Sequence, residues 1–374
     1  MISYRKLAMR VLGHSPVSAA KTARRRSTAK RAAALALTAA LVVGMTLPAF
    51  ADTWYIEDGD ISISAGTSGN HVEQGEKKQD ETTETIITNR ESTASSNAVT
   101  IEAGEGKTVD VTLKNVNIDA SSGAAVSVTG KGDTNIELNG NNTLTSGSGH
   151  AGLEHNKETN SEGKETSGTL TITDNNNDGK LTANGGIDGA GIGGSDEHDG
   201  QVTITGGEIT ATGGNGAAGI GGGAGDKYTA VGGDCDVTIS GGTITATGGS
   251  GAAGIGGGCD GNGTVIITDG DITAKARGYY GAGIGGGCGE IPKDTLIGGN
   301  GTVTISGGTI TEASGGYMAA GIGSGLQGLG TVTIEGDAVI KNAQGGAGAA
   351  GIGGGAESEP DDEGNGNKIS IKST

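Results

Sequence analysis

The sequence predicts an all-β chain that winds as a right-handed parallel β-helix, a single-chain β-solenoid. One observation is an internal repeat between Gly189 and Gly355, in which the tripeptide Gly-Ile-Gly recurs every 28 to 38 residues. Another is the set of intervals inside each repeat, which keep two segments constant in length and let a third vary. Between these points, apolar residues alternate with Thr in the period of two that is typical of strands.

The Gly-Ile-Gly tripeptides mark one corner of each predicted coil. Their central residues are Ile192, Ile220, Ile255, Ile284, Ile322 and Ile352. Small residues surround them, so we expect a crowded corner where backbones approach closely. The run from Gly189 also matches the spacing of a dinucleotide-binding fingerprint, but no helix-forming segment follows it. We therefore assign these glycines to packing rather than to nucleotide binding.

The intervals predict three short strands per coil, with Gly-Gly pairs permitting tight turns between them. Seven residues separate the first Val of each Val-Thr-Ile-like triplet from the apolar residue of the second strand, as from Val202 to Ile209 and from Val332 to Val339. A further 11 to 13 residues lead to the next Gly-Ile-Gly isoleucine, and 10 to 19 lead on to the next triplet. Such insertions at one corner are typical of a solenoid.

Equivalent isoleucines should align into internal ladders, because stacked coils lie about 4.8 Å apart. One ladder is expected from Ile204, Ile239, Ile267, Ile305 and Ile334. The Gly-Ile-Gly isoleucines should form another. The resulting core is narrow and aliphatic, in agreement with an aromatic content of only 2%.

Residues 1–51 have the pattern of a signal peptide. They contain nine Lys or Arg and no acidic residue, with a basic region up to Arg31, an apolar run over 32–47, and Ala49-Phe50-Ala51 as a cleavage site. The apolar run is too short for a membrane span. We expect no membrane insertion after cleavage, and a secreted, extracellular protein that is either free or associated with the cell surface.

Cleavage would leave a strongly acidic chain. Residues 52–374 carry 16 basic and 43 acidic residues, a net charge of −27. Such a surface repels nucleic acid and anionic lipids, which removes both from the expected partners. It suits a protein that collects divalent cations, although solubility alone would also explain it.

We expect residues 52–374 to form one monomeric β-helix domain. Its parts would be an irregular N-terminal cap region at 52–108, the coils at 109–355, and an acidic C-terminal segment at 356–374. Trp54 is expected to cover the end of the solenoid, because an open end leaves strand edges unpaired. The polar segment 73–97 is expected to be a loop.

Alternating segments before the repeat region carry a family resemblance. They are Val109–Ile118, Ala124–Val128, Asn135–Leu144, Gly168–Ile172 and Gly179–Leu181. Together with the Gly-Ile-Gly repeats, they resemble the secreted bacterial carbohydrate-binding parallel β-helix domain. The resemblance covers about residues 100–355, mostly in residues that make the fold. It implies a shape like that of pectate lyases, plant polysaccharide as ligand, and bound calcium.

Asp174, Asn176 and Asp178 form the D-x-N-x-D-G start of a calcium loop. Calcium takes six to eight oxygen ligands, and alternate residues of a tight loop can supply several of them. The twelfth position is Gly185 rather than Glu, so a bidentate ligand would have to come from elsewhere. Asn and Asp also favour turns without any metal. Asp196, Glu197 and Asp199, at the next insertion corner, are the candidates for a second, weaker site.

Four tyrosines are candidates for carbohydrate binding. Tyr279 and Tyr317 each lie five residues before a Gly-Ile-Gly isoleucine, so they should stack on successive coils; Tyr280 adjoins them, and Tyr228 lies in an insertion. Sugar rings pack their C–H faces on aromatic rings while phenol groups bind hydroxyls. The alternative is a tyrosine ladder that only shields a corner.

Cys259 and Cys288 each follow a Gly-Ile-Gly-Gly-Gly run, so they would lie one coil apart and within disulfide range. Cys235 competes for Cys259, and one thiol must remain unpaired.

Catalysis has little support in the sequence. A reaction like that of pectate lyases needs a base, commonly Arg, beside calcium-binding carboxylates, and residues 52–374 contain only Arg90 and Arg277, in contexts unlike lyase motifs. We predict a non-catalytic protein that binds polysaccharide, with calcium bridging to an acidic plant glycan. The alternatives are a cell-surface adhesin or structural solenoid, and a divergent polysaccharide lyase.

Overall fold

The structure is a computed structural model that describes residues 52–67, 69–80, 85–225, 233–289, 298–360 and 366–372. The predicted signal peptide at 1–51 and the candidate Tyr228 therefore lie outside the described residues. Within the described ranges the chain is built almost wholly of short strands, and no helix there is long and apolar enough to cross a membrane.

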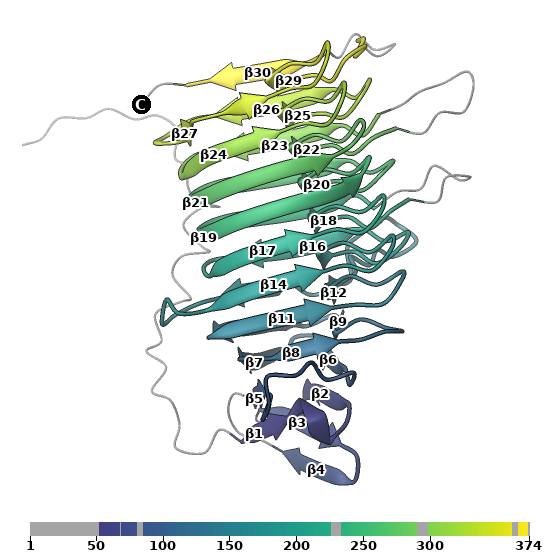
Figure 1. Cartoon of the computed structure of the whole chain (residues 1–374), viewed down its shortest axis with the longest axis vertical. Helices are drawn as coiled ribbons and strands as arrows, with labels where there is room; N and C mark the ends of the chain where they lie inside the picture. The colour runs from purple at the N-terminus through teal and green to yellow at the C-terminus, as the bar shows by residue number, and fades with distance from the viewer. Residues whose placement is uncertain are drawn as a thin grey trace, which may run out of the picture. The chain divides into compact units, whose positions relative to one another are not determined.

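The described strands pair into two sheets (Figure 1). The first sheet has 18 strands: β1 (Thr53–Tyr55), β5 (Thr85–Thr88), β7 (Thr108–Lys114), β8 (Asn117–Asp119), β10 (Asp133–Asn139), β11 (Asn141–Thr145), β13 (Leu170–Thr173), β14 (Lys180–Asn184), β16 (Gly200–Ile204), β17 (Glu208–Thr212), β19 (Cys235–Ser250), β21 (Gly263–Arg277), β23 (Gly301–Ile305), β24 (Thr309–Ser314), β26 (Gly330–Ile334), β27 (Val339–Ile340), β28 (Ala343–Gln344) and β30 (Lys368–Ile371). The second has 12 strands: β2 (Ile61–Ala65), β3 (Asn70–Gln74), β4 (Lys77–Asp80), β6 (Val99–Ala103), β9 (Val126–Gly130), β12 (Leu153–His155), β15 (Ile192–Gly193), β18 (Ile220–Gly221), β20 (Ile255–Gly256), β22 (Ile284–Gly285), β25 (Ile322–Gly323) and β29 (Ile352–Gly353). A short 3-10 helix, η2 (Ile56–Asp58), follows β1.

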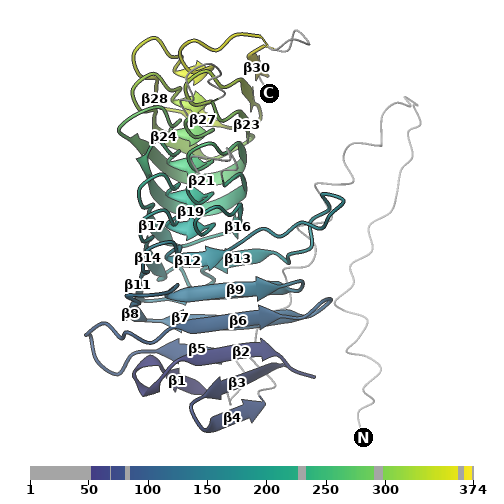
Figure 2. The same cartoon turned by 90° about the vertical axis from the view of Figure 1, so that its right-hand side faces the viewer.

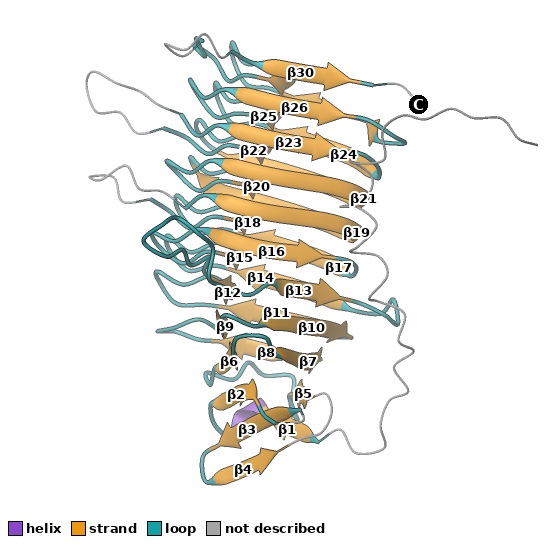
Figure 3. Cartoon of the chain, turned by 180° about the vertical axis from the view of Figure 1, so that it is seen from behind, coloured by secondary structure: helices purple, strands orange, loops and turns teal. Residues whose placement is uncertain are grey.

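A typical coil contributes two consecutive strands to the first sheet and one to the second. Strands β16, β17 and β18 make one such coil, and each pairs in parallel with the equivalent strand of the coil before and of the coil after. The teal loops of successive coils leave the stack at its corners (Figure 3). The fold is therefore the all-β parallel β-helix that the sequence predicts.

The predicted isoleucine ladders are confirmed by the strand register. Ile204 pairs with Ile239, and the series continues through Ile267, Ile305 and Ile334. The Gly-Ile-Gly isoleucines pair in the same way from Ile192 to Ile352. A further ladder joins Leu181, Ile209, Ile244, Ile272, Ile310 and Ile340. Each fully buried isoleucine contributes roughly 1.5–3 kcal/mol of burial free energy.

The predicted place of Val339 in this last ladder is wrong. Ile310 pairs with Ile340 instead, while Val339 pairs with Thr309 and is 48% exposed. The reason is the turn at Gly336, which has a φ of +63° and holds one residue more than the same turn of the preceding coil. The apolar interval in this coil is therefore eight residues, not seven.

The glycine turns between the first and second strands, Gly-Gly in most coils and Asp269-Gly270 in β21, bend the chain within one sheet rather than turn a corner. In β19 and β21 the two segments form one continuous strand. Their register shifts beside Gly242, whose φ is +92°. A Cβ at Gly242 would lie 2.7 Å from the carbonyl oxygen of Gly207 in the preceding coil, so close stacking requires glycine there.

The N-terminal end of the stack is closed by antiparallel strands. β2 pairs in parallel with β6 on one side and antiparallel with β3 on the other, and β4 follows (Figure 2). Segment 73–97, expected to be a loop, contains the end of β3, all of β4 and all of β5. Trp54 is 1% exposed, and the Nζ atom of Lys77 lies 3.6 Å from the centroid of its ring. Trp54 is thus core at this end rather than an exposed ligand platform.

Candidate functional site

Tyr279, Tyr280 and Tyr317 form an exposed aromatic cluster, which we call the tyrosine edge. Tyr279 and Tyr317 make an isolated parallel bridge, and their ring centroids lie 6.2 Å apart in an edge-on arrangement. Their residues are 59% and 52% exposed. The ring of Tyr280 lies 5.6 Å from that of Tyr279. The structure thus brings these three predicted residues together on neighbouring coils.

Backbone hydrogen bonds hold the tyrosine edge in place. The N–H of Tyr280 donates to the carbonyl oxygen of Tyr317 at 3.1 Å, and the N–H of Tyr317 donates to that of Gly278 at 3.0 Å. The carbonyl oxygen of Tyr280 accepts from the N–H of Leu326 at 3.0 Å. The rings are therefore presented from a backbone that is fixed to the next coil, which limits the entropy lost on binding.

The backbone of Tyr280 has a left-handed conformation that recurs at this corner. The residues four before each Gly-Ile-Gly isoleucine are Asp188, Gly216, Gly251, Tyr280, Met318 and Gly348, and all have φ between +68° and +88°. Glycine takes this conformation without cost, whereas another residue costs about 1 kcal/mol or more. Three of the six repeats have Gly at this offset, a pattern from which the left-handed backbone could have been predicted.

The predicted calcium loop uses its carboxylates to hold its own turn. The Asp174 carboxylate accepts the N–H of Asp178 at 3.2 Å and that of Gly179 at 3.1 Å. The Asp178 carboxylate accepts the N–H of Gly140 at 3.3 Å, and Asn176 is exposed. Asp174 thus closes its own loop, and Asp178 links the loop to the preceding coil. Each carboxylate keeps further lone pairs with which a cation could be bound.

Asp196 and Asp199, from the second candidate metal site, have different surroundings. The Asp199 carboxylate accepts the N–H of Asp234 at 2.8 Å, and burial raises the pKa of its carboxyl group. Burial, followed by the nearby charges of Asp188 and Glu197, raises the pKa of Asp196. Lys157 partly offsets this rise for Asp199, and His198 partly offsets it for Asp196.

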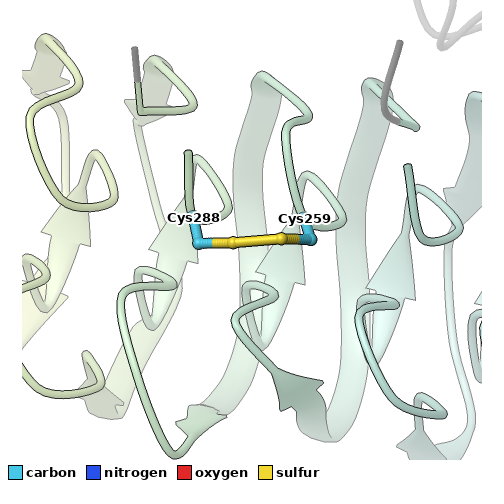
Figure 4. The surroundings of a disulfide bond; sticks show 2 residues. All are labelled: Cys259 and Cys288. Carbon is cyan, nitrogen blue, oxygen red and sulfur yellow. A yellow bond between two sulfur atoms is a disulfide. The ribbon is translucent and has the colours of Figure 1, made fainter. Parts of the chain in front are cut away.

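One compact group of three metal-ligating side chains occurs in the described part of the chain. It consists of Cys259, Asp260 and Cys288, whose ligand atoms lie within 4.8 Å of one another. Cys259 and Cys288 are joined by a disulfide, with 4.8 Å between their Cα atoms (Figure 4). A disulfide offers no thiolate, so this group is a cross-link between successive coils. The remaining thiol, Cys235, is buried, and burial raises its pKa.

A ladder of Asp and Asn side chains runs along another corner, and the sequence reasoning missed it. Each side chain accepts the backbone N–H of the equivalent residue one coil further on. Its members are Asp199, Asp234, Asn262 and Asn300, and the last accepts from Leu329. All four lie three residues before the Val of a triplet, a spacing that could have revealed them.

Comparison with known proteins adds one match. A family model described as a beta helix repeat matches residues 176–196, 202–224, 237–259, 265–288 and 303–326. No curated protein and no solved structure matches the chain. Each of the five matched stretches contains the second-strand segment and the Gly-Ile-Gly corner of a coil, and four of them also contain the Val-Thr-Ile-like triplet. The chain is therefore a parallel β-helix protein whose coils are similar to the beta helix repeat.

Proposed function

We propose that this chain is a secreted, non-catalytic protein that binds polysaccharide at the tyrosine edge. The observation that carries the proposal is Tyr280, which has a left-handed backbone at a position where three other coils have glycine and two have Asp188 and Met318. Strain of this kind is retained where a side chain has a use that offsets its cost. Here the side chain in question extends an exposed aromatic pair that spans two coils.

The chemistry of the tyrosine edge suits a sugar chain. Three rings offer π faces to the C–H groups of sugars, and three phenol groups can donate to or accept from hydroxyls. Both Tyr279 and Tyr317 are more than half exposed, so a ligand would gain the burial of aromatic surface that is now hydrated.

We include bound calcium in the proposal for the case in which the ligand is an acidic glycan. A chain with a net charge of −27 repels a polymer of uronic acids, and a cation held by Asp174 and Asp178 would reduce that repulsion. Calcium-dependent binding should therefore be found for acidic polysaccharides and not for neutral ones.

The test is glycan-array binding by the 52–374 chain, first with calcium and then with chelator. The Tyr279→Ala and Tyr317→Ala variants should lose most binding. The matched control is Ile187→Ala, because Ile187 has the same offset from its Gly-Ile-Gly isoleucine and is 60% exposed. An equal loss of glycan binding in Ile187→Ala would show that the tyrosine edge is not the binding site. Release of unsaturated uronic products from a polysaccharide would contradict the proposal that the protein is non-catalytic.

An adhesin that binds protein is the second candidate, and the last described coil favours it. Ile369 and Ile371 on β30 are 50% and 70% exposed, and no described strand pairs with the outer edge of β30. An exposed apolar strand edge can accept an additional strand from a partner. Absence of binding to every glycan would favour this function.

A further inference from the structure

The N-terminal coils carry a cavity that the sequence analysis did not identify. It is open to solvent, its volume is about 490 Å³, and residues of β1, β5 and β7 line it together with Asn89 and Arg90. This volume is within the range of about 300–1,000 Å³ that small-molecule sites occupy. All of its lining residues belong to the described part of the chain, and none of them belongs to the tyrosine edge.

Tyr55, Thr88 and Lys114 form one row across the cavity. Tyr55 pairs with Thr88, and Thr88 pairs with Lys114, on strands about 4.8 Å apart. Side chains alternate between the two faces of a strand. The preceding residues of these strands (Trp54, Ile87 and Leu113) are fully buried in the core, so the row faces outward. It places an aromatic ring, a hydroxyl and an ammonium group in line.

Arg90 completes the site. Its guanidinium carbon lies 4.0 Å from the centroid of the Tyr55 ring, and both terminal nitrogens donate to the Asp58 carboxylate. The hydrogen bond from Arg90 lowers the pKa of Asp58, so this pair is ionised at neutral pH. A guanidinium has five N–H groups, and three remain for a ligand after the two bonds to Asp58.

The site contains two cations, Arg90 and Lys114, and two carboxylates. The Asp58 carboxylate is held by the Arg90 guanidinium, and the Glu57 carboxylate accepts the backbone N–H groups of Arg90 and Glu91. Lys114 makes no ion pair with an acidic side chain in the described ranges, on a chain whose net charge is −27. Over longer distances this net charge repels polyanions, so the site favours a ligand with a single negative charge.

The frame of the site is preformed. The side chain of Asn89 accepts the N–H of Asn117 at 2.7 Å and donates to its carbonyl oxygen at 3.2 Å. The amide of Gln74 donates to the carbonyl oxygen of Tyr55 at 2.7 Å. The N–H of Arg90 donates to the Glu57 carboxylate at 2.8 Å. Ordered supports of this kind reduce the cost of binding a small ligand.

We propose that this cavity binds one acidic sugar residue, with its carboxylate on Lys114 and Arg90 and its ring against Tyr55. The sugar is either a free sugar acid or the terminal residue of a glycan. The site shares no residue with the tyrosine edge, so its success or failure is independent of the proposed polysaccharide binding.

The test is titration calorimetry on the protein secreted from the full sequence. The probes are glucuronate, glucose, and a glucuronide-terminated oligosaccharide that represents the glycan source. Glucuronate should bind and glucose should not. Binding of the oligosaccharide more tightly than glucuronate would assign the site to glycan ends, and equal or weaker binding would assign it to the free sugar acid.

Variants of Lys114 distinguish the site from surface charge in general. Lys114→Gln should weaken glucuronate binding about fivefold or more, and Lys114→Arg should retain most of it. Lys131→Gln, the loss of another exposed lysine, and Tyr279→Ala should leave it unchanged. Equal binding of glucose and glucuronate, or full binding by Lys114→Gln with native circular dichroism, would overturn the proposal.

Discussion

The carboxylate of Asp234 accepts the backbone N–H of Asn262 at 2.6 Å, across the boundary between two coils. We expect Asp234→Ala to lower the free energy of unfolding by about 1–2 kcal/mol, because the N–H of Asn262 loses its partner at a partly covered corner. Urea denaturation followed by circular dichroism measures this. Asp271→Ala removes an exposed acid from the neighbouring strand and should change stability by less than about 0.5 kcal/mol. Equal effects would show that net charge, not the ladder, accounts for the loss.

The imidazole of His71 links strands β3 and β4 in a pH-dependent manner. Hydrogen bonds to Glu73 and then to Asp80 raise its pKa, at nitrogen–oxygen distances of 3.1 and 2.7 Å. A raised pKa means that the stabilisation is complete below the unfolded value of about 6.5 and is lost as pH rises through the folded value. Amide hydrogen-exchange protection in β3 and β4 should therefore be greater at pH 5.5 than at pH 8.5. His71→Gln should remove this difference, and its persistence in the variant would exclude His71 as the cause.

The disulfide between Cys259 and Cys288 closes a loop of 29 residues in sequence separation. Its reduction should cost about 3 kcal/mol of stability, because the unfolded chain regains the freedom that the cross-link removes. Urea midpoints with and without reductant measure the cost. Cys235 should react with a thiol reagent only after unfolding, since it is buried. Reaction in the native protein would contradict its placement.

The register of the last coil can be checked by truncation of the adjacent residues Val339 and Ile340, with Ile310 of the preceding coil as the buried reference. Ile310→Ala should cost about 2–5 kcal/mol, because Ile310 is fully buried and its removal leaves a cavity. Val339→Ala should cost less than about 0.5 kcal/mol, since Val339 faces solvent. A large loss of stability for Val339→Ala, with a small one for Ile340→Ala, would show that Val339 occupies the core position and that the interval is seven residues.

Periodicity was sufficient to predict the fold, because each ladder repeats one apolar residue at a nearly constant interval and parallel stacking demands that alignment. The same reasoning is wrong at Val339, because one extra residue in the preceding turn moves the core position to the adjacent Ile340. It also missed the conformation of Tyr280, although the glycine at the same offset in three of the six repeats indicates a left-handed backbone there.

The candidate sites differ in how many of their residues could be predicted from the sequence. Tyr279 and Tyr317 were found because both have the same offset from a repeat landmark. The cavity at Tyr55, Arg90 and Lys114 draws on residues up to 59 positions apart that share no motif. They meet only because three coils stack in a particular register, which composition and spacing do not specify for the irregular region before residue 109.

The left-handed corner has a consequence for how this surface can change. One side chain per coil precedes the left-handed residue, in a column made of Ile187, Asn215, Ser250, Tyr279, Tyr317 and Ala347. These six positions follow the spacing of the coils, while the core ladders on the other side of the backbone remain constant. A substitution at one position of this column therefore changes the surface chemistry at a known level of the stack. It leaves the core ladders, which fix the spacing between levels, unchanged.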